Sequence, residues 1–141
     1  MSDWVVDASV AIKWFFPEIH AEAALRMLEG RHALRAPDLI IAEFGNVLWK
    51  RFLKEEISGK EAVTVTDAFL ALPLQVESSR ALIPVAMQIA CSARRTVYDG
   101  LYVAMAVVHQ CQLITADSKL YNALRNGPLS AYLRWVEDIP A

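Results

Sequence analysis

Short apolar runs alternate along the chain with longer segments of helical periodicity. The short runs predict β-strands because they are rich in branched or aromatic residues and are bounded by charged residues, Gly or Pro. These predicted strands are residues 3–7, 32–36, 74–76, 112–115 and 133–136.

The segments between these strands carry apolar residues three and four positions apart, which is the spacing of one helix face. Pro and Gly at their ends, a cap at Ser9 and a capping-box pattern at Ser58 and Glu61 give the boundaries. The predicted helices are residues 10–16, 18–29, 38–55, 58–72, 79–93, 98–110 and 117–125. Strands that alternate with helices favour parallel pairing, because parallel neighbours need crossover connections. We therefore expect one α/β domain over residues 1–141, with a mostly parallel sheet covered by helices on both faces.

The composition adds an expectation about partners. Hydrophobic residues make up 55% of the chain and charged residues 21%, against roughly 45–50% and 25% in typical soluble domains. This surplus suggests apolar surface for a partner chain. No run approaches the roughly 18 apolar residues of a membrane helix, and Asp3, Asp7 and Lys13 interrupt the segment where a signal peptide would be apolar. We expect a soluble cytoplasmic protein that does not enter a membrane.

Charge, cysteines and histidines exclude several classes of site. A net charge of −2 and a pI of about 5.9 argue against a protein that coats nucleic acid by charge alone, although a local basic groove is compatible with them. Cys91 and Cys111 lie in apolar stretches without CxxC spacing, and we expect buried, reduced thiols. His20, His32 and His109 are too scattered to indicate a zinc site.

Four acidic residues occupy informative places in this predicted fold. Asp7 ends the first strand and Asp117 follows the strand at 112–115, so both belong at the carboxyl ends of parallel strands, where α/β sheets bind ligands. Asp99 lies at the start of a helix. Glu43 lies on an otherwise apolar helix face, where a carboxylate is costly to bury unless it is paired or binds a cation.

Carboxylates gathered in one pocket repel one another, and a divalent metal relieves that repulsion. Oxygen ligands suit Mg²⁺ or Mn²⁺, which pair with phosphate oxygens and support phosphodiester hydrolysis. Each acid by itself also has an ordinary structural interpretation. Asp7 suits a strand-end turn, Asp99 and Asp117 suit helix N-caps, and Glu43 suits a half-exposed helix position.

Four segments in order resemble the signature segments of the PIN-domain family, and in particular of the VapC toxins. They are Val5–Val10, Pro37–Leu48, Tyr98–Ala106 and Thr115–Leu120. The resemblance implies a PIN-like three-layer α/β/α fold in which Asp7, Glu43, Asp99 and Asp117 form an acidic pocket. It makes Asp7 and Asp99 the principal metal ligands, Asp117 a ligand or support of a second ion, and Glu43 a ligand or an orienting group for the attacking water. Ser9 and Thr115 are candidates to support these ligands.

The same resemblance implies one or two Mg²⁺ or Mn²⁺ ions, cleavage of single-stranded or structured RNA, and a homodimer. It also implies a small VapB-like antitoxin whose basic tail enters the acidic pocket. Gly100 departs from the family pattern, in which Ala is more common, and we expect it to weaken the helix start slightly without affecting a ligand.

Cationic and aromatic residues near the expected pocket are candidates for RNA contact. The phosphate-contact and stacking candidates are Lys13, Arg94, Arg95, Lys119, Trp14, Phe15 and Tyr98. The alternative interpretation places Arg94 and Arg95 in a solvated loop and Trp14 and Phe15 in the core or a dimer contact. Asn46 shares a helix face with Glu43 and is either a ligand or a surface amide.

Other classes explain the pattern less well. A haloacid-dehalogenase-type phosphotransferase needs an Asp-x-Asp pair, and Ser9 stands in the second place. A receiver domain needs a phosphoacceptor Asp after its third strand, which the middle of the chain does not offer. A catalytically silent PIN module that binds RNA or a partner protein, and a PIN nuclease of RNA processing, remain as alternatives.

Overall fold

The computed structural model describes residues 3–30 and 32–140. Its centre is a five-stranded sheet with the order β3-β2-β1-β4-β5, and every neighbouring pair is parallel. The strands are β1 (Asp3–Val6), β2 (Ala33–Pro37), β3 (Leu74–Glu77), β4 (Gln112–Thr115) and β5 (Leu133–Trp135). The predicted α/β class is confirmed, and the sheet is more regular than expected, since all of its pairs are parallel.

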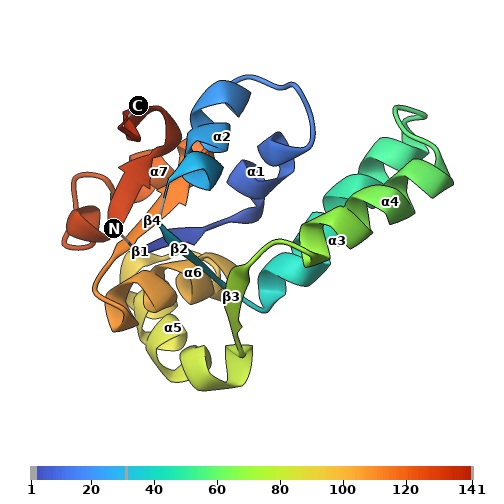
Figure 1. The fold of residues 1–141 in the computed structure, drawn as a ribbon. Helices are drawn as coiled ribbons and strands as arrows, with labels where there is room; N and C mark the ends of the chain where they lie inside the picture. The colour runs from blue at the N-terminus through green and yellow to red at the C-terminus, as the bar shows by residue number, and fades with distance from the viewer. Residues whose placement is uncertain (1–2, 31, 141) are drawn as a thin grey trace.

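Helices cover both faces of this sheet. They are α1 (Ala8–Ala11), α2 (Ala21–Glu29), α3 (Leu39–Leu53), α4 (Gly59–Leu70), α5 (Ser79–Ala93), α6 (Val97–Val108) and α7 (Ser118–Leu124). Figure 1 shows α1 and α2 on one side of the sheet and α5 and α6 on the other, while α3 and α4 pair as a hairpin that projects beyond the sheet. Three layers therefore form the body of the molecule, as predicted.

The middle strands are the most buried part of the sheet. Val5 and Val6 of β1 and Leu113 and Ile114 of β4 are completely buried, as expected for parallel strands that are covered on both faces. The strand order reverses between β1 and β4, because β1 is followed in sequence by β2 on one side and β4 lies on its other side. Ligands bind at such reversal points, outside the carboxyl ends of the strands.

The start of the first helical segment differs from the sequence prediction. Asp7, rather than Ser9, is the N-cap of α1, and its side chain accepts a hydrogen bond from the Val10 N–H. The helix ends at Ala11 and continues as a 3₁₀ turn over Ile12–Trp14. The prediction of a Ser9 cap is wrong because Ser and Asp are both good caps and Asp7 lies where the strand ends. The predicted capping box at Ser58 and Glu61 is present.

Gly100 has a packing role that the sequence prediction missed. A Cβ at this position would lie 2.6 Å from the carbonyl oxygen of Ala86 in α5, closer than two such atoms can approach. The residue is buried, as is Ala86. Glycine therefore allows α6 to pack closely against α5, and the expected small weakening of the helix is accompanied by this gain in packing.

The two cysteines are less buried than predicted. Both thiols are free, but Cys91 is exposed and Cys111 is half-buried, so the expectation of a buried thiol is wrong for Cys91. It lies on the outer face of α5, where a small apolar residue costs little to expose. Burial is sufficient to raise the pKa of Cys111.

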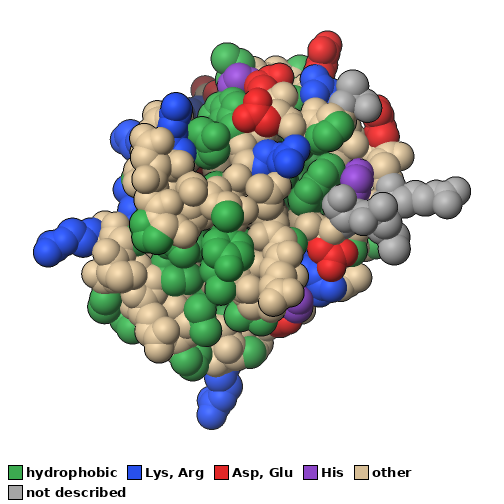
Figure 2. Space-filling model, turned by 90° about the vertical axis from the view of Figure 1, so that its left-hand side faces the viewer, with side chains coloured by type: hydrophobic (Ala, Val, Ile, Leu, Met, Phe, Trp, Pro, Cys, Tyr) green, Lys and Arg blue, Asp and Glu red, His purple; other side chains and the backbone are tan. Residues whose placement is uncertain are grey.

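The surface agrees with the modest net charge. On the face opposite the α3–α4 hairpin, hydrophobic side chains gather near the middle, and most Lys and Arg side chains lie toward the edges (Figure 2). None of the helices in the two described segments is both long and apolar enough to cross a membrane.

Candidate active site

Asp7 lies at the carboxyl end of β1 and is buried, with 6% of its surface exposed. Its Oδ1 accepts hydrogen bonds from the Ser9 hydroxyl at 2.5 Å and the Val10 N–H at 3.2 Å, and its Oδ2 accepts one from the Thr115 hydroxyl at 2.5 Å. Ser9 and Val10 lie in α1 and Thr115 ends β4, so the start of α1 and the end of β4 together fix the position of the carboxylate.

Burial controls the protonation of Asp7. It raises the pKa of this carboxyl from 3.8 to about 6, even though three hydrogen bonds act in the opposite direction, and the nearby charge of Asp117 raises it further. A nearby cation would counter both effects, because it favours the charged form of the carboxylate. The site thus keeps a carboxylate in a place where it is costly without a positive charge.

Asp117 faces the same point from the end of β4. It caps α7, since its Oδ1 accepts hydrogen bonds from the Lys119 and Leu120 N–H groups at 3.0 and 3.2 Å. Its own N–H donates to the Thr115 hydroxyl at 3.0 Å. Thr115 therefore connects Asp7 to Asp117, and the N-cap interpretation of Asp117 holds together with its place beside Asp7. Within the described residues, its Oδ2 accepts no hydrogen bond.

Glu43 approaches from α3 and is half-buried. The Tyr102 hydroxyl of α6 donates a hydrogen bond to its Oε1. Burial raises the pKa of Glu43, and the nearby charge of Asp99 adds to this effect. Burial, followed by contact with Glu43, also raises the pKa of Tyr102, so the phenol stays protonated and acts as a donor.

Asp99 lies in the first turn of α6, where Thr96 rather than Asp99 is the N-cap. Its carboxylate pairs with Arg95 one turn earlier, at 3.0 Å from Nη2 and 3.2 Å from Nε, and both contacts are made by Oδ2. The negative charge of Asp99 raises the pKa of Glu43, as the charge of Asp117 raises the pKa of Asp7. The four predicted acids thus form two electrostatically coupled pairs. The charges of Glu43 and Asp7 both raise the pKa of Tyr102.

The chemistry of these donors suits a hard divalent cation, because the acids offer carboxylate oxygens and no sulfur. In this arrangement no three His, Cys, Asp or Glu side chains of residues 3–30 and 32–140 are placed to hold one ion together. Protein donors occupy several of the carboxylate oxygens instead. Mg²⁺ keeps several waters and needs only one or two protein carboxylates. Among the four acids, Glu43 and Asp99 are each held by a single side chain, Tyr102 or Arg95.

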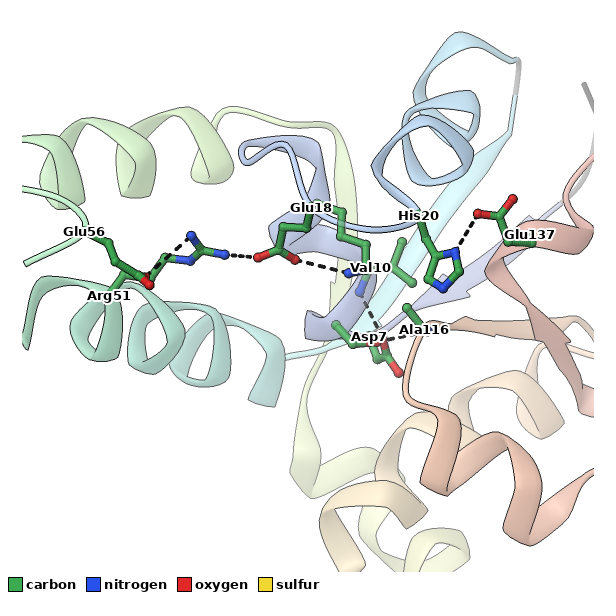
Figure 3. A network of polar contacts seen from close by, with 10 residues as sticks. Asp7, Val10, Glu18, His20, Arg51, Glu56, Ala116 and Glu137 are labelled. Carbon is green, nitrogen blue, oxygen red and sulfur yellow. Dashed lines mark hydrogen bonds and ion pairs between the residues drawn. The ribbon is translucent and has the colours of Figure 1, made fainter. Parts of the chain in front are cut away.

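Lys13 lies close to Asp7 but is not free at a pocket mouth. It is buried, and its Nζ is 3.1 Å from Glu18 Oε1. Glu18 also pairs with Arg51 of α3, and Figure 3 shows this chain of contacts running from beside Asp7 to Glu56. Burial, followed by repulsion from Arg51, lowers the pKa of Lys13, and Asp7 opposes that change. The proposed direct phosphate contact by Lys13 is therefore not supported by its position.

The aromatic candidates divide into core and surface residues. Trp14 is buried and donates its indole N–H to the Ala24 carbonyl at 2.9 Å. Phe15 packs edge-on against Phe44, with 5.6 Å between ring centroids. The core interpretation is correct for Trp14, and Phe15 is half-buried against the core. Tyr98 is 59% exposed and remains available for stacking.

The polar candidates outside the acids also differ in position. Arg94, Lys119 and Asn46 are exposed, whereas Arg95 turns inward to Asp99. The solvated-loop interpretation therefore holds for Arg94 and is wrong for Arg95. Asn46 occupies a surface position.

Sequence reasoning missed Tyr102. A Tyr within the apolar run of α6 was itself a signal, because a buried phenol needs a hydrogen-bond partner. It also lies three positions after Asp99, and so on the same side of the helix. The sequence did not show that its partner would be Glu43, which lies 59 positions earlier.

The fold and the acids together define a class: a parallel α/β domain with carboxylates outside the strand ends at the point where strand order reverses. The PIN domain family model matches residues 4–125. The chain belongs to the PIN-domain family.

Proteins similar to this chain include Ribonuclease VapC1 of Mycobacterium tuberculosis and Ribonuclease VapC3 of Pyrobaculum aerophilum. Each is 32% identical, over 122 and 120 residues respectively, covering 85% and 82% of this chain and 90% of each relative. The crystal structure of a Pyrobaculum aerophilum protein aligns with a TM-score of 0.69 and 24% identity, over 96% of this chain and 85% of the other. A toxin–antitoxin complex from Klebsiella pneumoniae aligns with a TM-score of 0.60 and 15% identity, over 96% and 98%. These two structures support the fold.

Proposed function

We propose that this protein is a metal-dependent endoribonuclease and the toxin component of a VapBC-type toxin–antitoxin pair. The observation that carries the proposal is the position of Asp7, a buried carboxylate beside Asp117 at the reversal point of a PIN-domain sheet. The similarity to two proteins named as VapC ribonucleases supports RNA as the substrate.

Asp7, Glu43, Asp99 and Asp117 are the proposed catalytic and metal-binding residues. A bound Mg²⁺ or Mn²⁺ would polarise the phosphate and make the attacking water more acidic. Ser9 and Thr115 orient Asp7 through hydrogen bonds to its two oxygens. Asp117 keeps Oδ2 directed away from its capping bonds, which use Oδ1.

Glu43 is the proposed group that orients the water or accepts its proton. Its raised pKa brings the carboxylate closer to the proton affinity that suits general-base work near neutral pH. The Tyr102 hydroxyl holds one oxygen, Oε1, and leaves the other for a ligand or water.

The test is cleavage of a panel of RNAs by purified protein with Mg²⁺ or Mn²⁺, with EDTA, and by an Asp99→Asn variant whose fold is checked by circular dichroism. Cleavage that requires the metal and is lost in the folded variant supports the proposal. Intact RNA with folded, metal-supplied protein, or equal cleavage by the variant, favours a catalytically silent PIN module that binds RNA or a protein.

The proposed partner is a small VapB-like antitoxin, as in the toxin–antitoxin complex that shares this fold. Large exposed apolar side chains gather on the α3–α4 hairpin, which offers surface for such a partner or for a homodimer. They are Ile41, Trp49, Phe52, Leu53, Val63 and Leu70. Light scattering of the protein alone, and again after co-expression with the product of a small neighbouring gene, distinguishes these assemblies. A PIN nuclease of RNA processing would instead cleave RNA without any such inhibitor.

A further inference from the structure

The Arg95 guanidinium forms an ion pair with the Asp99 carboxylate. Two of its nitrogens, Nη2 and Nε, contact the same oxygen, Oδ2, at 3.0 and 3.2 Å. Both side chains are about three-quarters buried, with 26% and 25% exposed. Arg95 thus holds an oxygen of a proposed metal ligand.

The turn between α5 and α6 separates Arg95 from its neighbour. Arg94 ends α5 in a left-handed conformation, with φ of 54°, and is exposed. The next residue donates its backbone N–H to the Ala90 carbonyl at 3.2 Å, and Thr96 then caps α6 through the Asp99 N–H. These hydrogen bonds fix the backbone of the turn between α5 and α6, and the Arg95 side chain can change its partner without changing them.

A divalent cation and the Arg95 guanidinium compete for Asp99 because both are positively charged and use the same carboxylate. We propose that Arg95 is a displaceable occupant of Asp99, which releases the carboxylate when a divalent cation binds and then contacts a phosphate of the RNA. This inference rests on the proposed function. While Arg95 holds Asp99, no three carboxylates of residues 3–30 and 32–140 share one ion position.

The guanidinium is suited to this exchange. It offers five N–H donors in a planar fork that matches phosphate as well as carboxylate geometry. Asp99 uses donors on Nε and Nη2, and within the described residues Nη1 has no acceptor. A phosphate that approaches four carboxylates needs positive charge beside it, and a released Arg95 supplies that charge next to the metal site.

The first test compares Arg95→Gln with Arg94→Gln, its exposed neighbour, by equilibrium titration with Mn²⁺. We expect Arg95→Gln to bind Mn²⁺ about two- to fivefold more tightly than wild type, the factor that corresponds to losing a partly exposed ion pair. Arg94→Gln should bind Mn²⁺ as wild type does, because its side chain makes no ion pair among the described residues.

The second test measures RNA affinity as a function of salt, with Mn²⁺ present and Glu43→Gln in the background to slow cleavage. Adding Arg95→Gln should reduce the slope of log affinity against log salt by about 0.7, which is the loss of one contact to single-stranded RNA. Arg95→Lys added to the same background should retain the slope of Glu43→Gln because it keeps the charge.

The third test is an NMR measurement on the wild-type protein, in which the Arg95 guanidinium is present. The Nε–H resonance of Arg95 in the wild-type protein, assigned by its absence in Arg95→Lys, should shift when Mg²⁺ is added. Unchanged Mn²⁺ affinity and salt slope in folded Arg95→Gln would overturn the inference, as would an Nε–H signal that ignores Mg²⁺. Wild-type protein that neither binds Mn²⁺ nor cleaves RNA would instead contradict the proposed function itself.

Discussion

The strand side and the helix side of the acidic site hold their carboxylates in different ways. Asp7 and Asp117 follow β1 and β4. The hydroxyls of Ser9 and Thr115 and backbone N–H groups at the starts of α1 and α7 donate hydrogen bonds to them. Glu43 and Asp99 lie on α3 and α6, and each is held by another side chain, Tyr102 or Arg95. Asp7 and Asp117 each accept at least one backbone N–H, whereas Glu43 and Asp99 are each held by one side chain, which can exchange its partner. The strand side therefore provides the more firmly held carboxylates, and the helix side provides carboxylates whose partners can exchange.

Replacing the strand-side anchor should have the largest effect. Asp7→Asn should lower RNA cleavage by at least about a hundredfold, because the several kcal/mol that a metal ion contributes to the transition state depend on its ligands. The same variant should be more stable than wild type without metal, since it removes a costly buried charge. Cleavage rates and urea unfolding in EDTA check both. A variant that is less active only because it is less stable would contradict this account.

The pH dependence of stability follows from the same residue. Its folded-state pKa of about 6 exceeds the ordinary value of 3.8, so the folded protein binds more protons between these values. Metal-free wild type should lose up to about 3 kcal/mol of unfolding free energy as pH rises from 4 to 7, relative to Asp7→Asn. Urea unfolding in EDTA at a series of pH values measures this difference. Parallel pH profiles of stability for the two proteins would show that folding does not raise the pKa of Asp7.

Glycines near the helix-side acids should respond in opposite directions. Gly100→Ala places a Cβ against the Ala86 carbonyl and should destabilise the protein by about 1–3 kcal/mol. Gly45→Ala, within α3, meets no atom within 4 Å and should stabilise the protein by about 0.5–1 kcal/mol through helix propensity. Thermal unfolding measures both. Equal effects would argue against close packing of α5 and α6 at Gly100.

Removing the hydroxyl that donates to Asp7, or the one that donates to Glu43, should have the smallest effects on stability, and the two losses should still differ measurably. Thr115→Val leaves an oxygen of buried Asp7 without a donor and should cost about 1–2 kcal/mol of stability. Tyr102→Phe should cost less than about 1 kcal/mol, because water can reach half-buried Glu43 in place of the phenol. Chemical unfolding of both variants gives the comparison. A larger loss of stability in Tyr102→Phe than in Thr115→Val would contradict the view that Asp7 is held more firmly than Glu43.

The sequence predicted the sheet well, together with the positions of Asp7 and Asp117 after its two central strands, because both depend on local pattern. Val5-Val6-Asp7 and Leu113–Asp117 each contain an apolar strand followed by a polar end, and parallel pairing brings such ends together. Burial of Trp14 also followed from its place in an apolar run.

The remaining features depend on tertiary contacts. The partner of Glu43 is Tyr102, 59 positions away. Arg95 turns inward to Asp99, whereas Arg94, in the left-handed conformation, is exposed. The need for Gly100 follows from the approach of α5. None of these contacts leaves a periodic signal in the chain.

The most direct test of the central claim is anomalous diffraction from crystals of the wild-type protein soaked in Mn²⁺. The account predicts a Mn²⁺ peak bounded by carboxylate oxygens of Asp7 and Asp99, with Arg95 displaced from Asp99. A Mn²⁺ ion bound elsewhere, or an empty acidic site in a protein that still cleaves RNA, would contradict it.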